Sequence, residues 1–199
     1  GKQNLPIWVQ EMMGMSGLRY RYLINHLVRL VRDPCYLEVG SWTGSTACAA
    51  VVNNECWVTC VDDWSLFGGP REEFHRNIGL ASGSSQLQIL EQDFRAVRFD
   101  QLAPKANIYL FDGPHSEVDQ FDAIALALPA LQDEFILVVD DFNWNEVRTG
   151  TLRAITTMGL SVSASITIRT DAAGSDPVVS FQHSDWHNGY FLAVVKKSR

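Results

Sequence analysis

The sequence predicts an α/β fold in which helices cover a doubly wound, seven-stranded and mostly parallel sheet. Seven short segments of strand length recur along the chain, and most of the segments between the first five have the periodicity of a helix. Strands joined through helices pair in parallel with right-handed crossovers. Four of the first five strands are apolar on both faces, which is typical of buried parallel strands.

The N-terminal half begins with helical spacing. Residues 17–32 form an amphipathic helix that ends before Pro34. The alternation then predicts strands at 35–40, 56–63 and 87–93, and helices at 44–53 and 71–81. Residues 8–15 contain a tryptophan and three methionines without a clear period. We expect them to pack on the core or on a second copy, or to form a lid over the site.

The C-terminal half continues the pattern. It predicts strands at 106–113, 134–141, 161–169 and 190–197, and helices at 116–131 and 145–158. Gln132 and Asp133 are expected in the turn before the fifth strand. A long polar loop at 170–189 joins the last two strands without a helix, so the last strand can run antiparallel at the sheet edge. His183, Trp186 and His187 in this loop either line the site or lie on the plain surface.

Bulk properties limit the function. The length of 199 residues suits one domain, with residues 1–34 as a helical segment packed on residues 35–199. A net charge of −7 and a pI of about 5.1 argue against nucleic-acid partners. No apolar run reaches the roughly 18 residues of a membrane span, and no signal peptide is visible, although the chain starts at Gly1 without methionine. The four cysteines are expected to be buried free thiols, which favours a cytoplasmic location.

A strand, an acid and two glycines form the first motif. Glu38 lies in the first strand, Gly40 ends it and Gly44 opens the next helix. Glycine allows a ligand to approach the backbone closely, and the N–H groups at a helix start can face that ligand. Ser41 and Ser45 add hydroxyl donors. The alternative is an ordinary tight turn.

Acids also follow the second and third strands. Asp62 and Asp63 end the second strand, where a carboxylate can accept both hydroxyls of an adenosine ribose. Trp64 offers a flat face to a base. Asp93, followed by Phe94, could accept from an adenine amino group. In the alternative interpretation Asp62 and Asp93 are turn residues and Trp64 belongs to the core.

Three further carboxylates end the fourth and fifth strands. Asp112, Asp140 and Asp141 should meet in one crevice, because parallel strands bring their carboxyl ends together. A hard divalent cation such as Mg²⁺ would relieve their mutual repulsion. His115 lies near this crevice and could act as a general base. The alternatives are that only one of Asp140 and Asp141 faces the crevice, and that His115 caps the following helix.

Taken together, these motifs resemble class I S-adenosylmethionine (SAM)-dependent methyltransferases over roughly residues 35–197. The run 111–144 is similar to metal-dependent O-methyltransferases of the macrocin and catechol types. The resemblance implies a Rossmann-like methyltransferase fold and a small hydroxylated acceptor, with Asp112 and His115 catalytic. It implies a SAM site and a Mg²⁺ site. The implied SAM residues are Glu38, Gly40, Ser41, Gly44, Ser45, Asp62, Asp63, Trp64, Asp93, Phe94 and Asp112, and the implied Mg²⁺ ligands are Asp112, Asp140 and Asp141.

Other functions stay open at this point. A non-catalytic or metal-independent SAM-binding protein would keep Glu38 and Asp62. A nicotinamide oxidoreductase would bind in the same crevice, but the third glycine of its motif is replaced by Ala47. A nucleic-acid methyltransferase is disfavoured, because the chain reads DGPH after the fourth strand, in place of an Asn/Asp-Pro-Pro-aromatic motif. A homodimer is compatible with the sequence.

Overall fold

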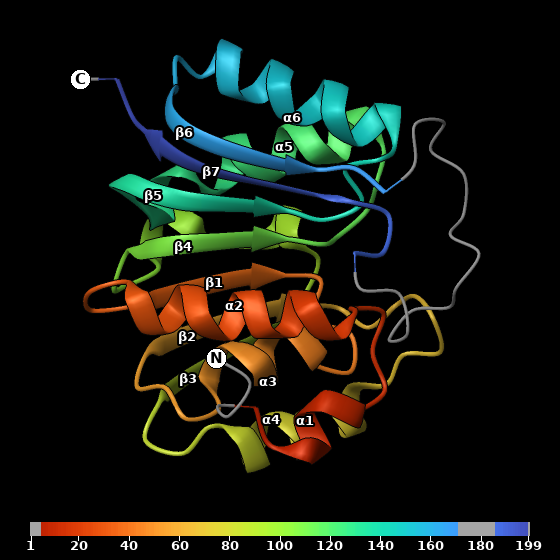
Figure 1. The fold of residues 1–199 in the computed structure, drawn as a ribbon. Coiled ribbons are helices and arrows are strands. Elements are labelled where there is room, and N and C mark those ends of the chain that lie inside the picture. The colour runs from red at the N-terminus through yellow and green to blue at the C-terminus, as the bar shows by residue number, and fades with distance from the viewer. Residues whose placement is uncertain (1–4, 171–185, 199) are drawn as a thin grey trace.

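The computed structural model describes residues 5–170 and 186–198, and these residues form one seven-stranded sheet. Its strands are β1 (Cys35–Val39), β2 (Trp57–Asp62), β3 (Gln86–Glu91), β4 (Ala106–Phe111), β5 (Leu131–Val139), β6 (Ser161–Ile168) and β7 (Tyr190–Lys196). Their order across the sheet is β3-β2-β1-β4-β5-β7-β6 (Figure 1). The first five strands are parallel, and β7 pairs antiparallel with both β5 and β6. The predicted fold class, including the reversed last strand, is confirmed.

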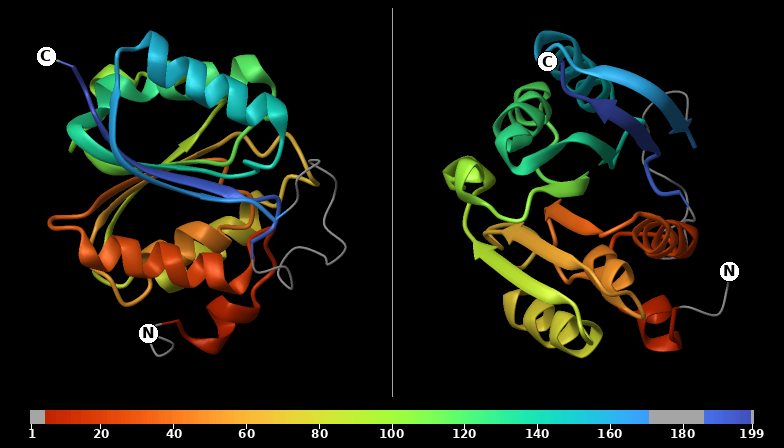
Figure 2. Two further views of the ribbon diagram at one scale, coloured as in Figure 1. Left: turned by 45° about the horizontal axis from the view of Figure 1, so that its top comes forward. Right: turned by 90° about the vertical axis from the view of Figure 1, so that its left-hand side faces the viewer.

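Helices cover both faces of the sheet (Figure 2). One face carries α1 (Ile7–Glu11), α2 (Leu18–Leu30), α3 (Ser45–Val51) and α4 (Arg71–Ala81), and the other carries α5 (Glu117–Ala127) and α6 (Asn145–Thr157). Successive strand residues point to opposite faces. Tyr36 therefore packs with the α2 and α3 side, and Leu37 packs with the α5 and α6 side. Three short 3-10 turns complete the helices, at Phe94–Ala96, Phe99–Gln101 and Leu128–Ala130.

Two element boundaries differ from the sequence prediction by three residues or more. The predicted helix at 116–131 ends at Ala127 and continues as a 3-10 turn that contains Pro129, which cannot donate a helical hydrogen bond. β5 starts at the fully buried Leu131, so Gln132 and Asp133 lie within the strand and not in a turn. α1 was not predicted, because five residues are too few to show helical periodicity.

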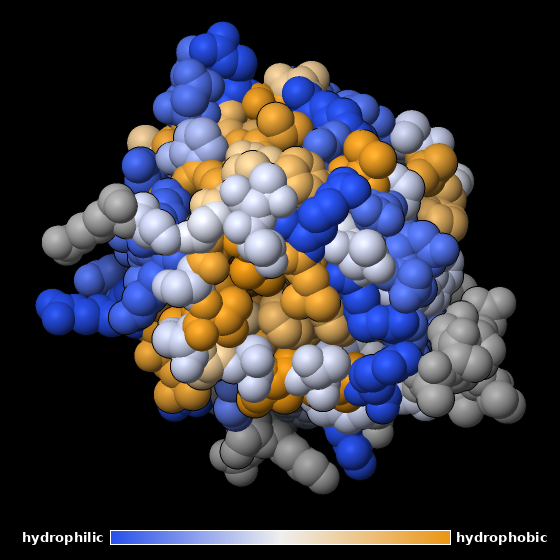
Figure 3. Space-filling view, turned by 90° about the horizontal axis from the view of Figure 1, so that it is seen from above, coloured by the Kyte–Doolittle hydropathy of each residue, from blue (hydrophilic) through white to orange (hydrophobic). Residues whose placement is uncertain are grey.

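The four cysteines are buried and form no disulfide, as the sequence predicted. Among residues 5–170 and 186–198, no helix is both long enough and apolar enough to cross a membrane. β6 is one of the two edge strands, and its Ile166 side chain is 63% exposed. Seen from above α6 and β6, apolar side chains gather near the centre of the surface among hydrophilic ones (Figure 3).

Candidate active site

A cavity of about 480 Å³ opens at the carboxyl ends of β1, β2, β4 and β5. The strand order reverses between β1 and β4, and open parallel sheets bind their ligands at such a reversal. The segments that follow these strands form most of the wall. Met15 adds to the wall from the N-terminal segment, and His187 and Asn188 add to it from the segment before β7.

The cavity collects most of the predicted site residues. Those that line it are Gly40, Asp62, Asp63, Asp93, Phe94, Asp112, His115, Asp140 and Asp141. Those that lie behind the lining are Glu38, Ser41, Gly44, Ser45 and Trp64. From the predicted C-terminal loop, His187 lines the cavity, Trp186 packs edge-on against Tyr190, and His183 lies outside the described residues.

Several lining residues were not predicted from the sequence. They are Val39, Trp42, Val61, Ser65, Leu66, Phe67, Gln92, Gly113, Pro114, Trp144 and Asn188. Met15 also lines the cavity, and it belongs to the segment for which a lid over the site was one alternative. Trp42, Phe67, Asp141 and Asn188 have positive φ angles, which residues with a side chain rarely adopt. Such backbone strain gathers at functional sites. The position of Trp42 between the two glycines was the one signal that could have singled it out.

Residues 40–45 lead from β1 into α3, and we call them the glycine loop. Its close packing requires glycine at positions 40 and 44. Gly40 and Gly44 both have a φ of +88°. A Cβ atom on Gly40 would lie 1.9 Å from the carbonyl oxygen of Asp112, so the backbone that follows β4 excludes any side chain there. The Ser45 hydroxyl lies 2.7 Å from the Ser16 hydroxyl, which keeps Ser45 behind the lining.

Asp62 stabilises the backbone around the cavity. Its Oδ2 accepts a hydrogen bond from the Trp42 N–H and its Oδ1 accepts one from the Trp64 N–H, each at 2.7 Å. Both tryptophans have positive φ, so one carboxylate holds two strained turns. A carboxylate has about four acceptor positions, so Asp62 can also accept from a ligand. The Trp64 indole donates to the Trp42 carbonyl at 2.8 Å and is buried, so it supports the glycine loop from behind.

Asp63 and Asp93 also hold turns at the cavity edge. Asp63 Oδ1 accepts from the Ser65 N–H at 2.9 Å, and Asp93 Oδ1 accepts from the Arg95 N–H at 2.8 Å. The turn role considered for Asp93 is therefore present, while its side chain also lines the cavity. The Phe94 ring packs edge-on against Phe111, with the ring centres 5.5 Å apart.

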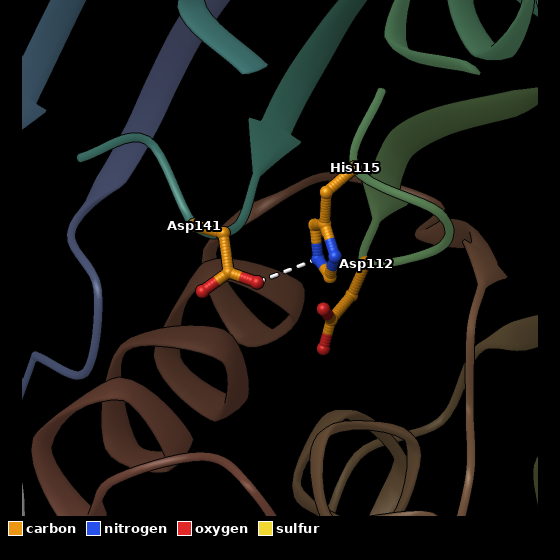
Figure 4. Close-up of side chains that lie close together, drawn as sticks. All are labelled: Asp112, His115 and Asp141. Atoms are coloured by element: carbon orange, nitrogen blue, oxygen red, sulfur yellow. Dashed lines mark ion pairs between the residues drawn. The ribbon is translucent and has the colours of Figure 1, made fainter. Parts of the chain in front are cut away.

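Two carboxylates and one imidazole converge at the other end of the cavity. One ligand atom from each of Asp112, His115 and Asp141 lies within 4.8 Å of the others (Figure 4). His115 Nε2 is 2.6 Å from Asp141 Oδ2. Ser116 caps α5 through a capping box with Asp119, so His115 does not serve as the helix cap.

Asp140, which also lines the cavity, supports this cluster through the backbone of Asp141. Its Oδ1 accepts a hydrogen bond from the Asp141 N–H at 2.7 Å, which holds Asp141 at its positive φ of 54°. Burial, followed by the charge of Asp112, raises the pKa of Asp140 well above its usual value. Burial and then the charge of Asp141 raise the pKa of Asp112 in the same direction. The ionised forms of these carboxylates are therefore unfavourable in the buried crevice.

His115 has a pKa above its usual value. Burial lowers it, but the hydrogen bond and charge of Asp141, together with the charge of Asp112, raise it by more. The Trp144 ring lies beside the imidazole, with the ring centres 5.1 Å apart. The geometry therefore provides a proton acceptor held between a carboxylate and an aromatic wall.

Glu38 is fully buried behind the glycine loop, on the same face of β1 as Tyr36. The Tyr36 hydroxyl donates to its Oε2 at 2.5 Å, and Oε1 has no partner among the described residues. Burial raises the pKa of Glu38 to about 7, although the Tyr36 hydrogen bond opposes this shift. The folded protein thus binds this proton more tightly than the unfolded chain.

Glu38 should therefore destabilise the fold progressively as pH rises from about 4.5 to about 7. We expect Glu38→Gln to remove this dependence of the free energy of unfolding on pH. The gain in the free energy of unfolding from the substitution should be about 3 kcal/mol larger above pH 7 than near pH 4.5. Urea denaturation of both proteins across this range measures the difference. Equal pH slopes in the variant and the wild type would contradict this prediction.

Comparisons with known proteins agree with this geometry. A family model described as a methyltransferase domain matches residues 37–142, which include the glycine loop, the end of β1 and all of β2 to β5. No curated protein matches the chain in sequence.

Solved methyltransferase structures have a similar fold at low identity. An O-methyltransferase from Bacillus cereus in complex with SAH has a TM-score of 0.59 at 13% identity, covering 88% of this chain and 80% of that one. The O-methyltransferase TomG from Streptomyces achromogenes, in complex with SAM, has a TM-score of 0.60 at 13% identity over 88% and 79%. The ribosomal protein L11 methylase from Lactobacillus delbrueckii subsp. bulgaricus has a TM-score of 0.57 at 14% identity over 90% and 77%. Such likeness shows the fold alone.

Proposed function

Since this chain belongs to the methyltransferase domain family and is a SAM-dependent methyltransferase, we propose that it methylates a hydroxyl oxygen of a small molecule. The family assignment also sets aside the nicotinamide oxidoreductase that the sequence left open. The observation that carries the proposal is the convergence of Asp112, His115 and Asp141 at one end of the cavity. These groups can orient a hydroxyl and take its proton, which an O-methyl transfer requires.

The donor would lie with its adenosine toward the ends of β2 and β3. Asp62 and Asp93 line that end and retain acceptor capacity for the ribose hydroxyls and the adenine amino group. Gly40 lines the cavity at the strand reversal, so its backbone can approach the donor closely. This orientation directs the methyl group toward Asp112 and the acceptor end.

The acceptor end favours a small and partly apolar molecule. Trp144 lies there beside His115, Met15 and His187 add to the cavity wall, and the cavity volume of about 480 Å³ lies within the usual range of small-molecule sites. The net charge of −7 disfavours a polyanionic acceptor such as RNA. The small-molecule acceptor, the possible homodimer and the cytoplasmic location stay predictions.

The acceptor cluster fits a divalent cation. Asp112 and Asp141 offer carboxylate oxygens and His115 offers an imidazole nitrogen, a donor set that suits Mn²⁺ as well as Mg²⁺. Asp140, which the sequence named as a third ligand, accepts the Asp141 N–H and would orient that ligand. When bound, a cation would supply Lewis-acid polarisation of the acceptor hydroxyl.

The chain's own residues would align the reactants and move the proton. The acceptor oxygen forms its bond to the methyl carbon in line with the breaking carbon–sulfur bond, and the sulfonium becomes the neutral thioether of S-adenosylhomocysteine. In the cluster without a cation, the hydroxyl proton would pass to the His115–Asp141 pair. Where the imidazole lone pair is bound to a cation, a carboxylate oxygen of the cluster would take the proton. Trp144, beside His115, would exclude water from the acceptor side.

Removal of divalent cations with EDTA is expected to lower kcat at least about tenfold, with recovery on addition of Mg²⁺ or Mn²⁺. Calorimetry with Mn²⁺ alone gives a readout that does not depend on turnover. Asp141→Asn should weaken Mn²⁺ binding, and Asp100→Asn, at the surface beside Arg98, should leave it unchanged. Unchanged turnover after EDTA would contradict a role for the cation in methyl transfer. The His115–Asp141 pair would then remain as the sole proton acceptor.

Transfer of a labelled methyl group from SAM to sets of small phenols, sugars, amines and thiols tests the acceptor class. We expect label in the hydroxylated compounds. Label confined to amines, thiols, protein or RNA would overturn the proposed O-methylation while leaving the methyltransferase assignment intact.

A further inference from the structure

Arg21 in α2 is a fully buried arginine, and its hydrogen-bond acceptors among the described residues are all oxygen atoms of the N-terminal segment. Its Nη1 donates to the carbonyls of Val9 at 2.9 Å, Met12 at 2.9 Å and Gln10 at 3.3 Å. Its Nε donates to the Ser16 carbonyl and hydroxyl, each at 3.1 Å. Buried arginines usually pair with a carboxylate, whereas this one is bonded to backbone carbonyls and one hydroxyl among the described residues.

The burial of this charge has to be offset by its hydrogen bonds. Burial lowers the pKa of Arg21 to about 10, so the guanidinium remains protonated at neutral pH. A guanidinium presents five N–H donors in a planar fork, and a lysine ammonium cannot reach as many carbonyls in this geometry. The arrangement therefore fixes the path of residues 9–16 through a side chain that does not touch the cavity.

The N-terminal turn, which comprises residues 12–16, contacts the glycine loop directly. The Thr43 hydroxyl donates to the Met13 carbonyl at 2.7 Å. Gly14 lies so close to the loop that a Cβ atom there would be 2.3 Å from the Ser45 Cβ. The next residue, Met15, lines the cavity. The turn and the loop are thus one packed unit.

We propose that Arg21 is a positioning residue for methyl transfer, which holds the N-terminal turn against the glycine loop and sets Met15 in the cavity wall. The inference rests on the proposed placement of SAM beside the glycine loop. It assigns to the N-terminal segment a part in donor binding, in addition to the lid or packing role expected from its methionines. A displaced turn would free the loop at Thr43 and open the wall at Met15.

Arg21→Met and Arg21→Lys test the proposal in the full chain. We expect Arg21→Met to weaken S-adenosylhomocysteine binding about tenfold by calorimetry and to raise KM for SAM more than it lowers kcat. Arg21→Lys should restore part of the affinity. Arg29→Met, at an exposed position of the same helix, should leave affinity unchanged. A folded Arg21→Met with wild-type affinity and KM would overturn the proposal.

A second variant covers the case in which Arg21→Met does not fold. Thr43→Val keeps the side-chain shape and removes the bond to the Met13 carbonyl. Weaker binding of S-adenosylhomocysteine, with a melting temperature close to that of the wild type, supports coupling between turn and loop. Unchanged binding in Thr43→Val would overturn it, whatever the fate of Arg21→Met. Failure of the proposed O-methylation would appear separately, as methylation of a different acceptor class with intact donor binding.

Discussion

Replacing His115 with alanine is expected to lower kcat by about 10²–10⁴-fold, the usual contribution of a positioned acid–base group. The imidazole lies 2.6 Å from Asp141 and in the same cluster as Asp112. Under the proposed function, its loss removes the proton acceptor of the cluster without a cation, or one ligand of the cluster that holds one. Binding of S-adenosylhomocysteine should persist, because the proposed nucleoside contacts are at the ends of β2 and β3.

His75→Ala is the matched control for this experiment. His75 also pairs with an acid, Glu91, at 3.0 Å, but it lies on α4 outside the cavity lining. We expect its kcat to equal that of the wild type. Single-turnover rates separate the methyl-transfer step from product release. A His115→Ala protein with wild-type single-turnover rate would show that the proton leaves by another route.

Gly40→Ala is expected to destabilise the fold by about 3 kcal/mol or more and to abolish donor binding. The new Cβ would lie 1.9 Å from the Asp112 carbonyl oxygen, and the φ of +88° is unfavourable for alanine. Relief of this clash requires β1 and the segment after β4 to separate. Urea denaturation and calorimetry with S-adenosylhomocysteine measure the two effects.

Gly79→Ala should have the opposite effect on the stability of the protein. Gly79 lies inside α4, and a Cβ atom there meets nothing within 4 Å. Alanine in a helix interior should therefore stabilise the protein by about 0.5–1 kcal/mol. Equal stability changes at the two glycines would mean that the contact between Gly40 and Asp112 does not limit the fold.

The sheet was predictable because its signals are local. Apolar segments such as 56–63 and the helices between them define strand count and direction before any tertiary contact is known. The start of β5 was misplaced because its first residue, Leu131, is selected by burial against neighbours that are distant in sequence. α1 is too short to carry a periodic signal.

The site was predictable where topology alone determines position. Asp62, Asp112 and Asp141 follow parallel strands, so their meeting at one edge required only the strand order. The place of His115 beside Asp141, and of Asp140 behind it, depends on side-chain rotamers and one residue with positive φ. Sequence spacing does not contain that information.

The sequence left the place of Met15 and His187 open between the site and other positions, for a related reason. Met15 reaches the cavity only because a buried arginine folds the N-terminal turn back onto the glycine loop. That contact also hides Ser45, whose hydroxyl meets Ser16 behind the lining. Knowledge of the helices and strands without the side-chain contacts does not tell that Met15 lines the cavity and that Ser45 does not.

The contact of Gly40 with the Asp112 carbonyl has a consequence for redesign of the enzyme. The loop that would receive the donor touches the backbone that presents the acceptor carboxylate, with no room for a single methyl group between them. Reshaping the loop to admit bulkier sulfonium donors would therefore displace Asp112, and enlarging the acceptor side would disturb the loop. Under the proposed placement of donor and acceptor, we expect the two ranges to be linked through this contact, so libraries that vary both of its sides together should outperform those that vary either side alone.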